Sequence, residues 1–241
     1  MSEKMKAAPY TNRGVENTSK YPLIVDWVTF SGHFQTFQEM IEFLGLKNSG
    51  LEFKECSPRW FYKYSVTYDN HITLMLTQKE DYTACVNISG QGCRLIESFS
   101  CYSLLDLIKR VALLDDFNMS RIDIAQDIID DKFNINKLVK AYKKGNYTCR
   151  SKFSNLMQSI DDGIEGTSLY FGKKGSNCFI NIYDKRAERG FRPEDMPNWT
   201  RIEIRLRAEN AKGFSDKLLT GQDVGFFIRE CLITTYGLLL L

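Results

Sequence analysis

The sequence predicts an α+β fold, in which helices pack on one face of a mainly antiparallel central sheet. Short segments rich in β-branched and aromatic residues recur along the 241 residues, separated by turn-like stretches, as in strands joined by hairpins. Segments with apolar residues at helical spacing lie between groups of these strands. The order is strands, helix, strand, helix, strands and helix. This grouping favours α+β over the regular alternation of a parallel sheet.

The individual elements follow from these two periodicities. We expect strands at residues 23–30, 60–68, 72–78, 84–89, 120–129, 168–172, 177–184 and 200–207. We expect helices at residues 35–46, 103–114 and 135–144, with further helices from residue 211 onward. The segment Gly90-Gln91-Gly92 is interpreted as a sharp break between elements, because closely spaced glycines disfavour regular structure. The stretch 173–176 is expected to form the turn of a hairpin.

Composition places the chain among globular proteins. Hydrophobic residues make up 43% and aromatic residues 13%, which excludes a disordered chain. The net charge of +2 excludes a protein that holds nucleic acid through bulk charge alone. The length suits one large domain, so we expect a mobile polar tail over residues 1–20 and a single domain over residues 21–241. The closing run of four leucines, with no polar residue after it, suggests a truncated C-terminus.

The cysteines and histidines limit the chemistry. Seven cysteines at irregular spacing, with no C-x-x-C pair, predict neither a disulfide framework nor a zinc site. The two histidines, His33 and His71, lie far apart and form no metal-ligand pair. Any metal or acid–base chemistry must therefore rest mainly on carboxylates. The sequence has no signal peptide and no apolar run of membrane-spanning length, so we expect a cytoplasmic protein without a membrane partner.

Three of the expected strands separate polar from apolar side chains, because side chains alternate between the two faces of a strand. The polar faces hold Arg121, Asp123 and Asp127 in the strand at 120–129, Phe179, Asn181 and Tyr183 in the strand at 177–184, and Arg201, Glu203, Arg205 and Arg207 in the strand at 200–207. The opposite faces carry mainly isoleucine and leucine and suit helix packing. Carboxylates, arginines and a tyrosine are therefore expected to share one face of the sheet.

Two interpretations of this polar face are open. One is an ordinary half-solvated sheet whose outer face meets water. The other is a functional site, because the face lacks the lysine, threonine and serine mixture of indifferent surface. Asp123 and Asp127 also lie four positions apart with the small Ala125 between them, which leaves room for an ion. Carboxylate ligands select hard cations, so the cofactor expected here is Mg²⁺ or Mn²⁺.

The chemistry that suits such a face is phosphoryl transfer at a DNA phosphodiester. A tyrosine phenol needs activation to act as a nucleophile, and a divalent cation and arginines offset the charge of the transition state. Basic residues near the face suit DNA phosphates, and aromatic residues suit unpaired bases. The candidate DNA-binding residues are Lys173, Lys174, Arg186, Arg189, Arg201 and Arg205. A charged hairpin of this kind is also compatible with an ordinary solvated turn.

Four segments of the chain resemble the replication initiation factor family, which comprises initiators of rolling-circle plasmids and related relaxases of integrative conjugative elements and phages. The segments are MSRIDIAQDIIDD at 119–131, SLYFGKKGSNCFINIYDKRAERG at 168–190, WTRIEIRLRAE at 199–209 and, more loosely, YPLIVDWVTF at 21–30. Their order and spacing match, and together they span residues 21–210. The resemblance implies a fold like that of the HUH endonucleases, with carboxylates in place of paired histidines. The scarcity of histidine agrees with this.

The resemblance also implies roles for particular residues. The family's nucleophilic tyrosine matches Tyr183, and Lys185 beside it is expected to contact the scissile phosphate or support the tyrosine. Asp123, Asp127 and Glu203 match acidic positions of the family and are expected to bind the metal or activate the nucleophile.

Several alternatives to these assignments remain. Tyr170 competes with Tyr183 but is better suited to a structural or base-stacking role, and Asp130 or Asp131 could take over from Asp127. Some relatives place an acidic residue in the segment 84–92, where this chain has Asn87 and Ser89, so a further ligand is open there. His71 is a spare candidate ligand.

The function that the resemblance implies is site-specific nicking and strand transfer at an origin, by a domain in which a tyrosine attacks the phosphodiester. The products are a 5′-phosphotyrosyl enzyme and a free 3′-hydroxyl, which serve rolling-circle replication or conjugative transfer of a plasmid or mobile element. The implied partners are origin DNA, with a single-stranded or hairpin nick site and flanking duplex, a host helicase and a second copy of the chain. Two alternatives are a non-catalytic DNA-binding regulator with the same fold and a metal-dependent hydrolase with a water nucleophile.

Overall fold

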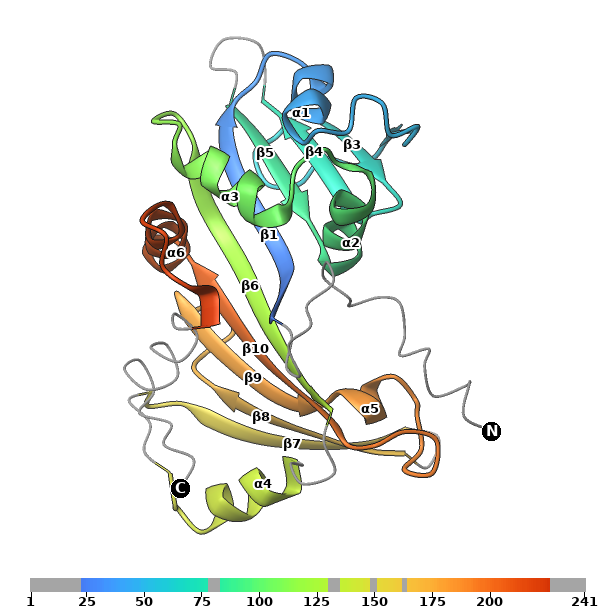
Figure 1. Ribbon diagram of the computed structural model, residues 1–241, viewed down its shortest axis with the longest axis vertical. Coiled ribbons are helices and arrows are strands. Elements are labelled where there is room, and N and C mark those ends of the chain that lie inside the picture. Colours follow the sequence, from blue (N-terminus) through green and yellow to red (C-terminus); the bar gives the residue numbers. More distant parts are fainter. Residues whose placement is uncertain (1–22, 78–82, 130–134, 148–150, 162–163, 226–241) are drawn as a thin grey trace.

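In the part of the chain that the structure describes, ten strands form one antiparallel sheet (Figure 1), in the order β2-β3-β4-β5-β1-β6-β10-β9-β8-β7. The computed structural model describes residues 23–77, 83–129, 135–147, 151–161 and 164–225. The strands are β1 (Leu23–His33), β2 (Lys54–Glu55), β3 (Tyr64–Tyr68), β4 (Ile72–Leu76), β5 (Thr83–Ile88), β6 (Asn118–Ile129), β7 (Ser154–Asp161), β8 (Ile164–Phe171), β9 (Cys178–Asp184) and β10 (Trp199–Arg207). The long strands β1, β6 and β10 are neighbours at the centre of the sheet.

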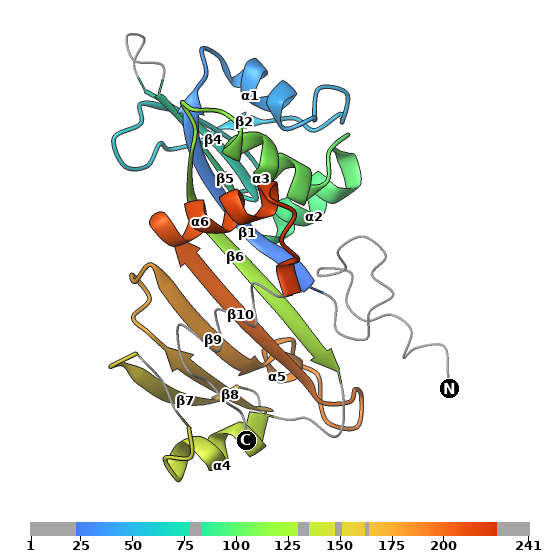
Figure 2. The same ribbon diagram turned by 60° about the vertical axis from the view of Figure 1, so that its left-hand side comes forward.

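Most of the helices cover one face of this sheet. They are α1 (Phe37–Phe43), α2 (Gly90–Phe99), α3 (Leu104–Ala112), α4 (Ile135–Lys143), α5 (Lys185–Glu188) and α6 (Glu209–Leu219). Figure 2 shows α6 lying across the sheet next to α3, and these two helices are in contact. The short α5 is the exception, because it directly continues β9 and lies on the opposite side of the sheet from α4 (Figure 1).

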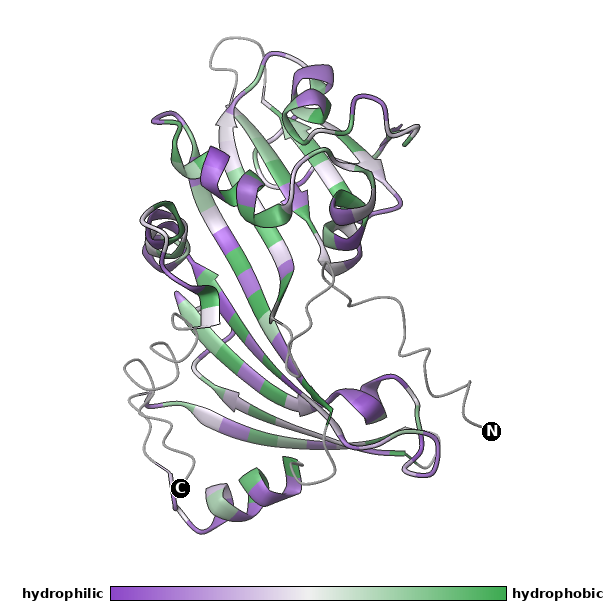
Figure 3. Cartoon of the chain, viewed as in Figure 1, coloured by the Kyte–Doolittle hydropathy of each residue, from purple (hydrophilic) through white to green (hydrophobic). Residues whose placement is uncertain are grey.

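The core lies between the covered face and the helices. Val28, Ile122 and Ile204, from the three central strands, are at most 1% exposed. Leu107 of α3 and Phe214 of α6 pack against the same cluster. Each such side chain contributes about 1.5–3 kcal/mol by leaving water. Figure 3 shows the resulting pattern, in which hydrophobic and hydrophilic residues alternate along β6 and β10.

The helices begin at side chains that cap them. Thr36, Ser89 and Ser103 precede α1, α2 and α3, and each side-chain oxygen accepts a hydrogen bond from a backbone N–H in the first turn. A cap of this kind contributes about 1 kcal/mol. In α3 the first-turn acid Asp106 also accepts a hydrogen bond from the Ser103 hydroxyl at 2.7 Å.

The expected fold class is confirmed, and the structure corrects several details. The segment Gly90-Gln91-Gly92 is not a break but the first turn of α2. Its glycines are required by close packing, because a Cβ at Gly92 would collide with the backbone carbonyl oxygen of His71, and a Cβ at Gly90 would lie 2.8 Å from a carboxylate oxygen of Asp26. Steric need, rather than flexibility, explains both positions.

Other expectations about the elements also needed correction. The strand expected at 60–68 begins only at Tyr64, because Trp60 has a positive φ of 59° that ends extended structure before it. The edge strand β7 and the short β2 were not expected. β7 escaped notice because its outer side chains, such as Met157 and Ile160, are exposed and its pattern does not alternate cleanly.

Some expectations fall outside the described residues. These concern the polar tail at 1–20, Asp130 and Asp131, and the helices expected towards residue 241. The division of the chain into a tail and a single domain therefore stays a prediction. None of the helices in the described part of the chain is long and apolar enough to cross a membrane.

Candidate active site

The strand register brings the expected polar residues together on the face that α2, α3 and α6 leave uncovered. Arg201 of β10 lies opposite Asp127 of β6 on one side and Tyr183 of β9 on the other. Arg205 lies opposite Asp123 in the same way. Glu203 sits between these two rows, opposite small or uncharged neighbours. The charged residues of β6 and β10, together with Asn181 and Tyr183 of β9, thus form one continuous polar face.

This face is not an ordinary wet surface. Asp123 is 2% exposed, Asp127 is 5% exposed and Arg201 is 0% exposed. Charged side chains are almost never buried to this extent unless they are paired. The interpretation as a half-solvated sheet is therefore wrong for the centre of the polar face.

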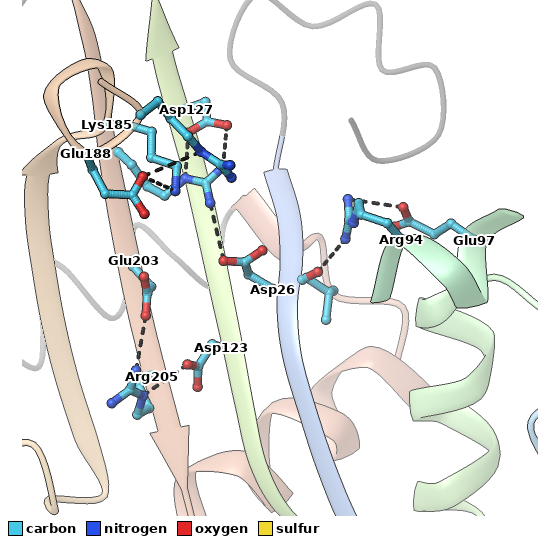
Figure 4. A network of polar contacts seen from close by, with 12 residues as sticks. Asp26, Arg94, Glu97, Asp123, Asp127, Lys185, Glu188, Glu203 and Arg205 are labelled. Atoms are coloured by element: carbon cyan, nitrogen blue, oxygen red, sulfur yellow. Dashed lines mark hydrogen bonds and ion pairs between the residues drawn. The ribbon is translucent and has the colours of Figure 1, made fainter. Parts of the chain in front are cut away.

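Arg201 bonds to two carboxylates, those of Asp127 and Asp26, which are labelled in Figure 4. Its Nε and one Nη donate to the two oxygens of Asp127, each at 2.7 Å, and its other Nη donates to Asp26 at 3.2 Å. This two-pronged geometry is the strongest that a guanidinium makes with a carboxylate. Both oxygens of Asp127 are occupied by the arginine. Arg201 was expected to contact DNA, but it is fully buried. Its hydrogen bonds instead link β10 to the neighbouring strand β6 and to β1.

Asp26 was not expected from the sequence. The register of β1 on β6 shifts between Val25 and Trp27, so Asp26 is the extra residue of a β-bulge. The bulge turns its carboxylate to the polar face, where it meets Arg201 (Figure 4). Burial raises the pKa of Asp26, and Arg201 opposes this rise. One feature of the sequence could have indicated this residue, because Asp26 is the single carboxylate in the largely apolar strand β1.

Asp123 and Glu203 form the second part of the site. Asp123 accepts hydrogen bonds from Arg121 Nε at 2.8 Å and from Arg205 Nε at 3.0 Å. Glu203 has a weaker contact, 3.3 Å from an Nη of Arg205. Burial, reinforced by the charges of Asp123 and Asp26, raises the pKa of Glu203 to about 7. Glu203 is therefore the least compensated carboxylate of the face.

The mutual repulsion of three carboxylates bears on whether a metal ion fits this face. Asp26, Asp123 and Glu203 come from three adjacent strands, and the first two both raise the pKa of the third. A divalent cation would relieve this repulsion, and carboxylate oxygens are the donors that Mg²⁺ and Mn²⁺ prefer. Among the residues described, no three Asp, Glu, His or Cys side chains already stand close enough to form a finished metal site. The donor chemistry fits a hard cation, with side-chain adjustment.

Tyr183 lies at the end of the same face. Burial raises the pKa of its phenol well above the ordinary value, while the charge of Arg201 lowers it. The Nζ of Lys185 lies 5.5 Å from the centre of the Tyr183 ring and 2.6 Å from a carboxylate oxygen of Glu188. Burial and the nearby Arg201 lower the pKa of Lys185, and Glu188 opposes this. The tyrosine therefore needs help to lose its proton, and a buried cation stands beside it.

Tyr170, the competing tyrosine, lies one strand further out. It pairs with Asn181 and stacks on Phe179, with ring centres 5.7 Å apart. The Nζ of Lys174 lies 5.9 Å from its ring centre. This placement fits the stacking role expected for it.

The other expected DNA-binding residues lie in three places. Arg205 of β10 is bonded to Asp123 and Glu203, and the remaining four lie in the β8–β9 turn or in and directly after α5. Lys173 and Lys174 are exposed in the β8–β9 turn, where the Lys173 ammonium lies 4.0 Å from the ring centre of Phe153. Arg186 donates to the backbone carbonyl of Met196 at 3.3 Å, and Arg189 lies 3.6 Å from Glu188. These four residues remain candidates, with the lysines the most accessible.

The remaining open positions are placed as follows. Asn87 lies on the polar face, and its side-chain oxygen accepts hydrogen bonds from the Trp27 indole at 3.1 Å and the Thr29 hydroxyl at 2.9 Å. His71 lies in the turn directly before β4, and its backbone, rather than its ring, makes the hydrogen bonds to Tyr68 and Ser89. Neither residue joins the carboxylates.

Comparisons with known proteins agree with this architecture. The family model described as "Replication initiation factor" matches residues 117–238, and the model described as "Rolling Circle replication initiation protein N-terminal domain" matches residues 22–105. A protein of Bacillus subtilis (strain 168), assigned as the DNA relaxase NicK, is 30% identical over 92% of this chain and 68% of its own length. The structure of a rolling circle replication initiator protein from Geobacillus stearothermophilus superimposes with a TM-score of 0.78 and 26% identity, covering 90% of this chain and 85% of that one.

Proposed function

Because this chain belongs to the replication initiation factor family, we propose that it nicks one strand of an origin DNA and so initiates rolling-circle replication or transfer of a mobile element. The origin DNA is its substrate and partner. The same kinship leads us to propose a host helicase and a second copy of this chain as further partners.

We propose Tyr183 as the nucleophile. The observation that supports it is its position opposite Arg201 in the register, at the end of a buried charged face, with Lys185 Nζ 5.5 Å from its ring centre. The phenol oxygen attacks the phosphorus of the scissile phosphodiester, and the bond from phosphorus to the 3′ oxygen breaks. The phenol proton leaves and the 3′ oxygen gains a proton. A 5′-phosphotyrosyl bond and a free 3′-hydroxyl result.

The residues around the tyrosine have distinct proposed tasks. Lys185 stabilises negative charge on the phenol oxygen and on the phosphate, because its side chain is buried and its Nζ lies 5.5 Å from the centre of the Tyr183 ring. Arg201 keeps Asp127 and Asp26 in place and brings positive charge towards Tyr183, where it lowers the pKa of the phenol. Arg205 holds Asp123 in the same manner.

We propose that Asp26, Asp123 and Glu203 hold the divalent cation, Mg²⁺ or Mn²⁺. Asp127 was expected among the ligands, but its proposed task is to position Arg201, which is fully buried and bonded to both of its oxygens. Both oxygens of Asp123 also accept hydrogen bonds from arginines, and Asp123 is kept among the proposed ligands because its charge raises the pKa of Glu203. When bound, the cation polarises the scissile phosphate and offsets its charge.

The test is incubation of the protein with supercoiled plasmid that carries the element's own origin, in Mn²⁺, followed by denaturation in detergent. We expect nicked circles that carry covalently attached protein. Tyr183→Phe should abolish the covalent product, and Tyr170→Phe, the matched control, should retain it. A Tyr183→Phe protein that still forms the adduct would refute the assignment. Nicking without any adduct would indicate a water nucleophile, and DNA binding without nicking would indicate a regulator.

A further inference from the structure

A cavity at the other end of the polar face has no part in the proposed chemistry. It measures about 430 Å³, within the range of ligand-binding pockets. Its lining includes Trp27, Arg59, Trp60, Asn87, Arg121 and Arg207. We propose that this cavity binds one unpaired nucleotide of the DNA strand that is cut. The inference rests on the proposed function for the identity of that strand.

The inner aromatic wall of the cavity is held in place before any ligand arrives. The Trp27 indole N–H donates to Thr29 Oγ1 at 3.0 Å and to Asn87 Oδ1 at 3.1 Å. The guanidinium carbon of Arg121 lies 4.1 Å from the centre of the indole ring. These contacts come from three different strands, so the ring has little freedom to move. A preorganised aromatic wall lowers the entropic cost of binding a flat ligand.

Trp60 forms the outer aromatic wall and is unusual in two ways. Its side chain is 69% exposed, although tryptophan is normally highly buried. Its backbone has a φ of 59°, in the left-handed region that is a genuine outlier for a bulky residue. Strain of this kind clusters at ligand-binding sites, where it presents a side chain for contact. The ring already makes an edge contact with Tyr62, with ring centres 6.4 Å apart, and its exposed part is available to stack on an unpaired base.

The polar lining consists mostly of hydrogen-bond donors. Arg59, Arg121 and Arg207 contribute guanidinium groups to the lining. The Nε of Arg121 also donates a hydrogen bond to Asp123. The side-chain oxygen of Asn87 is already bonded to Trp27 and Thr29, so its amide presents the NH₂ group as a donor. A ligand that carries a phosphate and acceptor atoms on a flat ring matches this lining.

The position of the cavity relative to Tyr183 favours a nucleotide of the same strand. In the strand register, Arg207 of β10 lies opposite Arg121 at the cavity, and Arg201 of β10 lies opposite Tyr183. The two sites are therefore six residues apart along β10. At roughly 3.3 Å per residue this is about 20 Å. A stacked strand advances about 3.4 Å per nucleotide, so the cavity would take a base at most about six nucleotides from the cut. A base that remains paired in duplex could not enter it.

The experiment compares two adjacent exposed aromatic residues. Trp60 lines the cavity, whereas Phe61, which is 68% exposed and stacks on Tyr62, does not. The probe is a fluorescein-labelled single-stranded oligonucleotide of twelve nucleotides in EDTA, with a duplex of the same sequence as comparison. We expect Trp60→Gly to weaken single-strand binding by at least about fivefold and Phe61→Ala to change it less than about twofold. Duplex binding should be unchanged in both.

Trp60→Gly is the suitable substitution because glycine adopts a positive φ readily, so the fold should tolerate it. A second measurement does not depend on any variant: an oligonucleotide containing 5-iodouracil should cross-link to Trp60 or Trp27 of the wild-type protein. Equal effects of the two substitutions, or cross-links that map only elsewhere, would overturn the proposal.

Failure of this proposal can be distinguished from failure of the proposed function. If the wild-type protein forms the Tyr183 adduct but Trp60→Gly binds single strands normally, the cavity proposal is wrong and the nicking proposal stands. If Trp60→Gly selectively loses single-strand binding but no adduct ever forms, the cavity proposal stands and the nicking proposal is wrong.

Discussion

Arg201 is the residue on which the candidate active site depends most. It is fully buried, bonds to both oxygens of Asp127 and also reaches Asp26. A buried ion pair of this kind gains little net stability over an apolar replacement, because removing both charges from water is costly. Its presence beside Tyr183 is therefore better explained by function than by folding.

We expect Arg201→Met to lower the free energy of unfolding by about 3–5 kcal/mol, because it leaves the buried Asp127 carboxylate without its partner. The double variant Arg201→Met/Asp127→Leu should recover part of this loss, since it removes the orphaned charge as well. Urea denaturation of the wild type and both variants measures the effect. A single variant that loses less than about 1 kcal/mol would contradict the role assigned to this pair.

Glu203 makes stability depend on pH in a defined direction. Its pKa is about 7 in the folded protein, against 4.5 as its ordinary value, so the folded state favours the protonated form. The contribution is fully present below pH 4.5 and is lost as pH rises through about 7. In EDTA, Glu203→Gln should match the wild type near pH 4. Above pH 8 it should be more stable by up to about 3 kcal/mol. Urea denaturation across this range tests it, and identical pH profiles would contradict it.

Local features of individual strands and helices decide how the site is assembled. The bulge in β1 delivers Asp26 to the polar face, and the first turn of α2 packs close behind it through Gly90. Gly92, in the same turn, lies against the backbone of His71. A helix that begins with two glycines is intrinsically weak, so close approach to β1 and β4 is what stabilises its start.

The two helical glycines Gly92 and Gly213 should respond oppositely to alanine. A Cβ at Gly92 would collide with the His71 carbonyl oxygen, whereas nothing lies within 4 Å of a Cβ at Gly213 in α6. We expect Gly92→Ala to lower the melting temperature by several degrees. Gly213→Ala should raise stability by about 0.5–1 kcal/mol, because alanine is the better helix former. Thermal unfolding distinguishes them, and a neutral Gly92→Ala would show that α2 moves freely against the sheet.

The strands that form the site could be predicted from the sequence, but some of their details could not. Alternation in the segments around Asp123, Tyr183 and Glu203 is regular, so their shared face followed directly from a period of two. Asp26 escaped because a bulge breaks that period, and its position depends on the pairing of β1 with β6. The helical start of α2 could not be predicted because its glycines are required by close tertiary contacts, and their local preference is for a break.

The whole molecule is organised by the two faces of one sheet. The pairing of β1 with β6 joins the parts of the chain that match the two family models, so the polar face is continuous across both. Tyr183 stands towards one end of this face and the Trp27 cavity towards the other, with the carboxylates between them. This arrangement suits a single strand of DNA lying along β10.

Divalent cations should stabilise the folded molecule if the carboxylates bind them. A ligand that binds only the folded state raises the free energy of unfolding by about 2.7 kcal/mol at a hundred times its dissociation constant. We expect Mn²⁺ to raise the melting temperature of the wild type. The shift should be lost in Asp123→Asn and retained in Asp106→Asn, an exposed carboxylate of α3. An equal rise of the melting temperature in all three proteins would contradict the proposal that Asp26, Asp123 and Glu203 bind the cation.

The most direct test of the central claim is to identify the residue that carries the nucleotide after nicking. The covalent product formed with origin plasmid is trimmed with nuclease, digested with protease and sequenced by tandem mass spectrometry. The account predicts that the modified peptide contains Tyr183 linked to a 5′-phosphate. A nucleotide on Tyr170 or any other residue, or linkage through a 3′-phosphate, would contradict it.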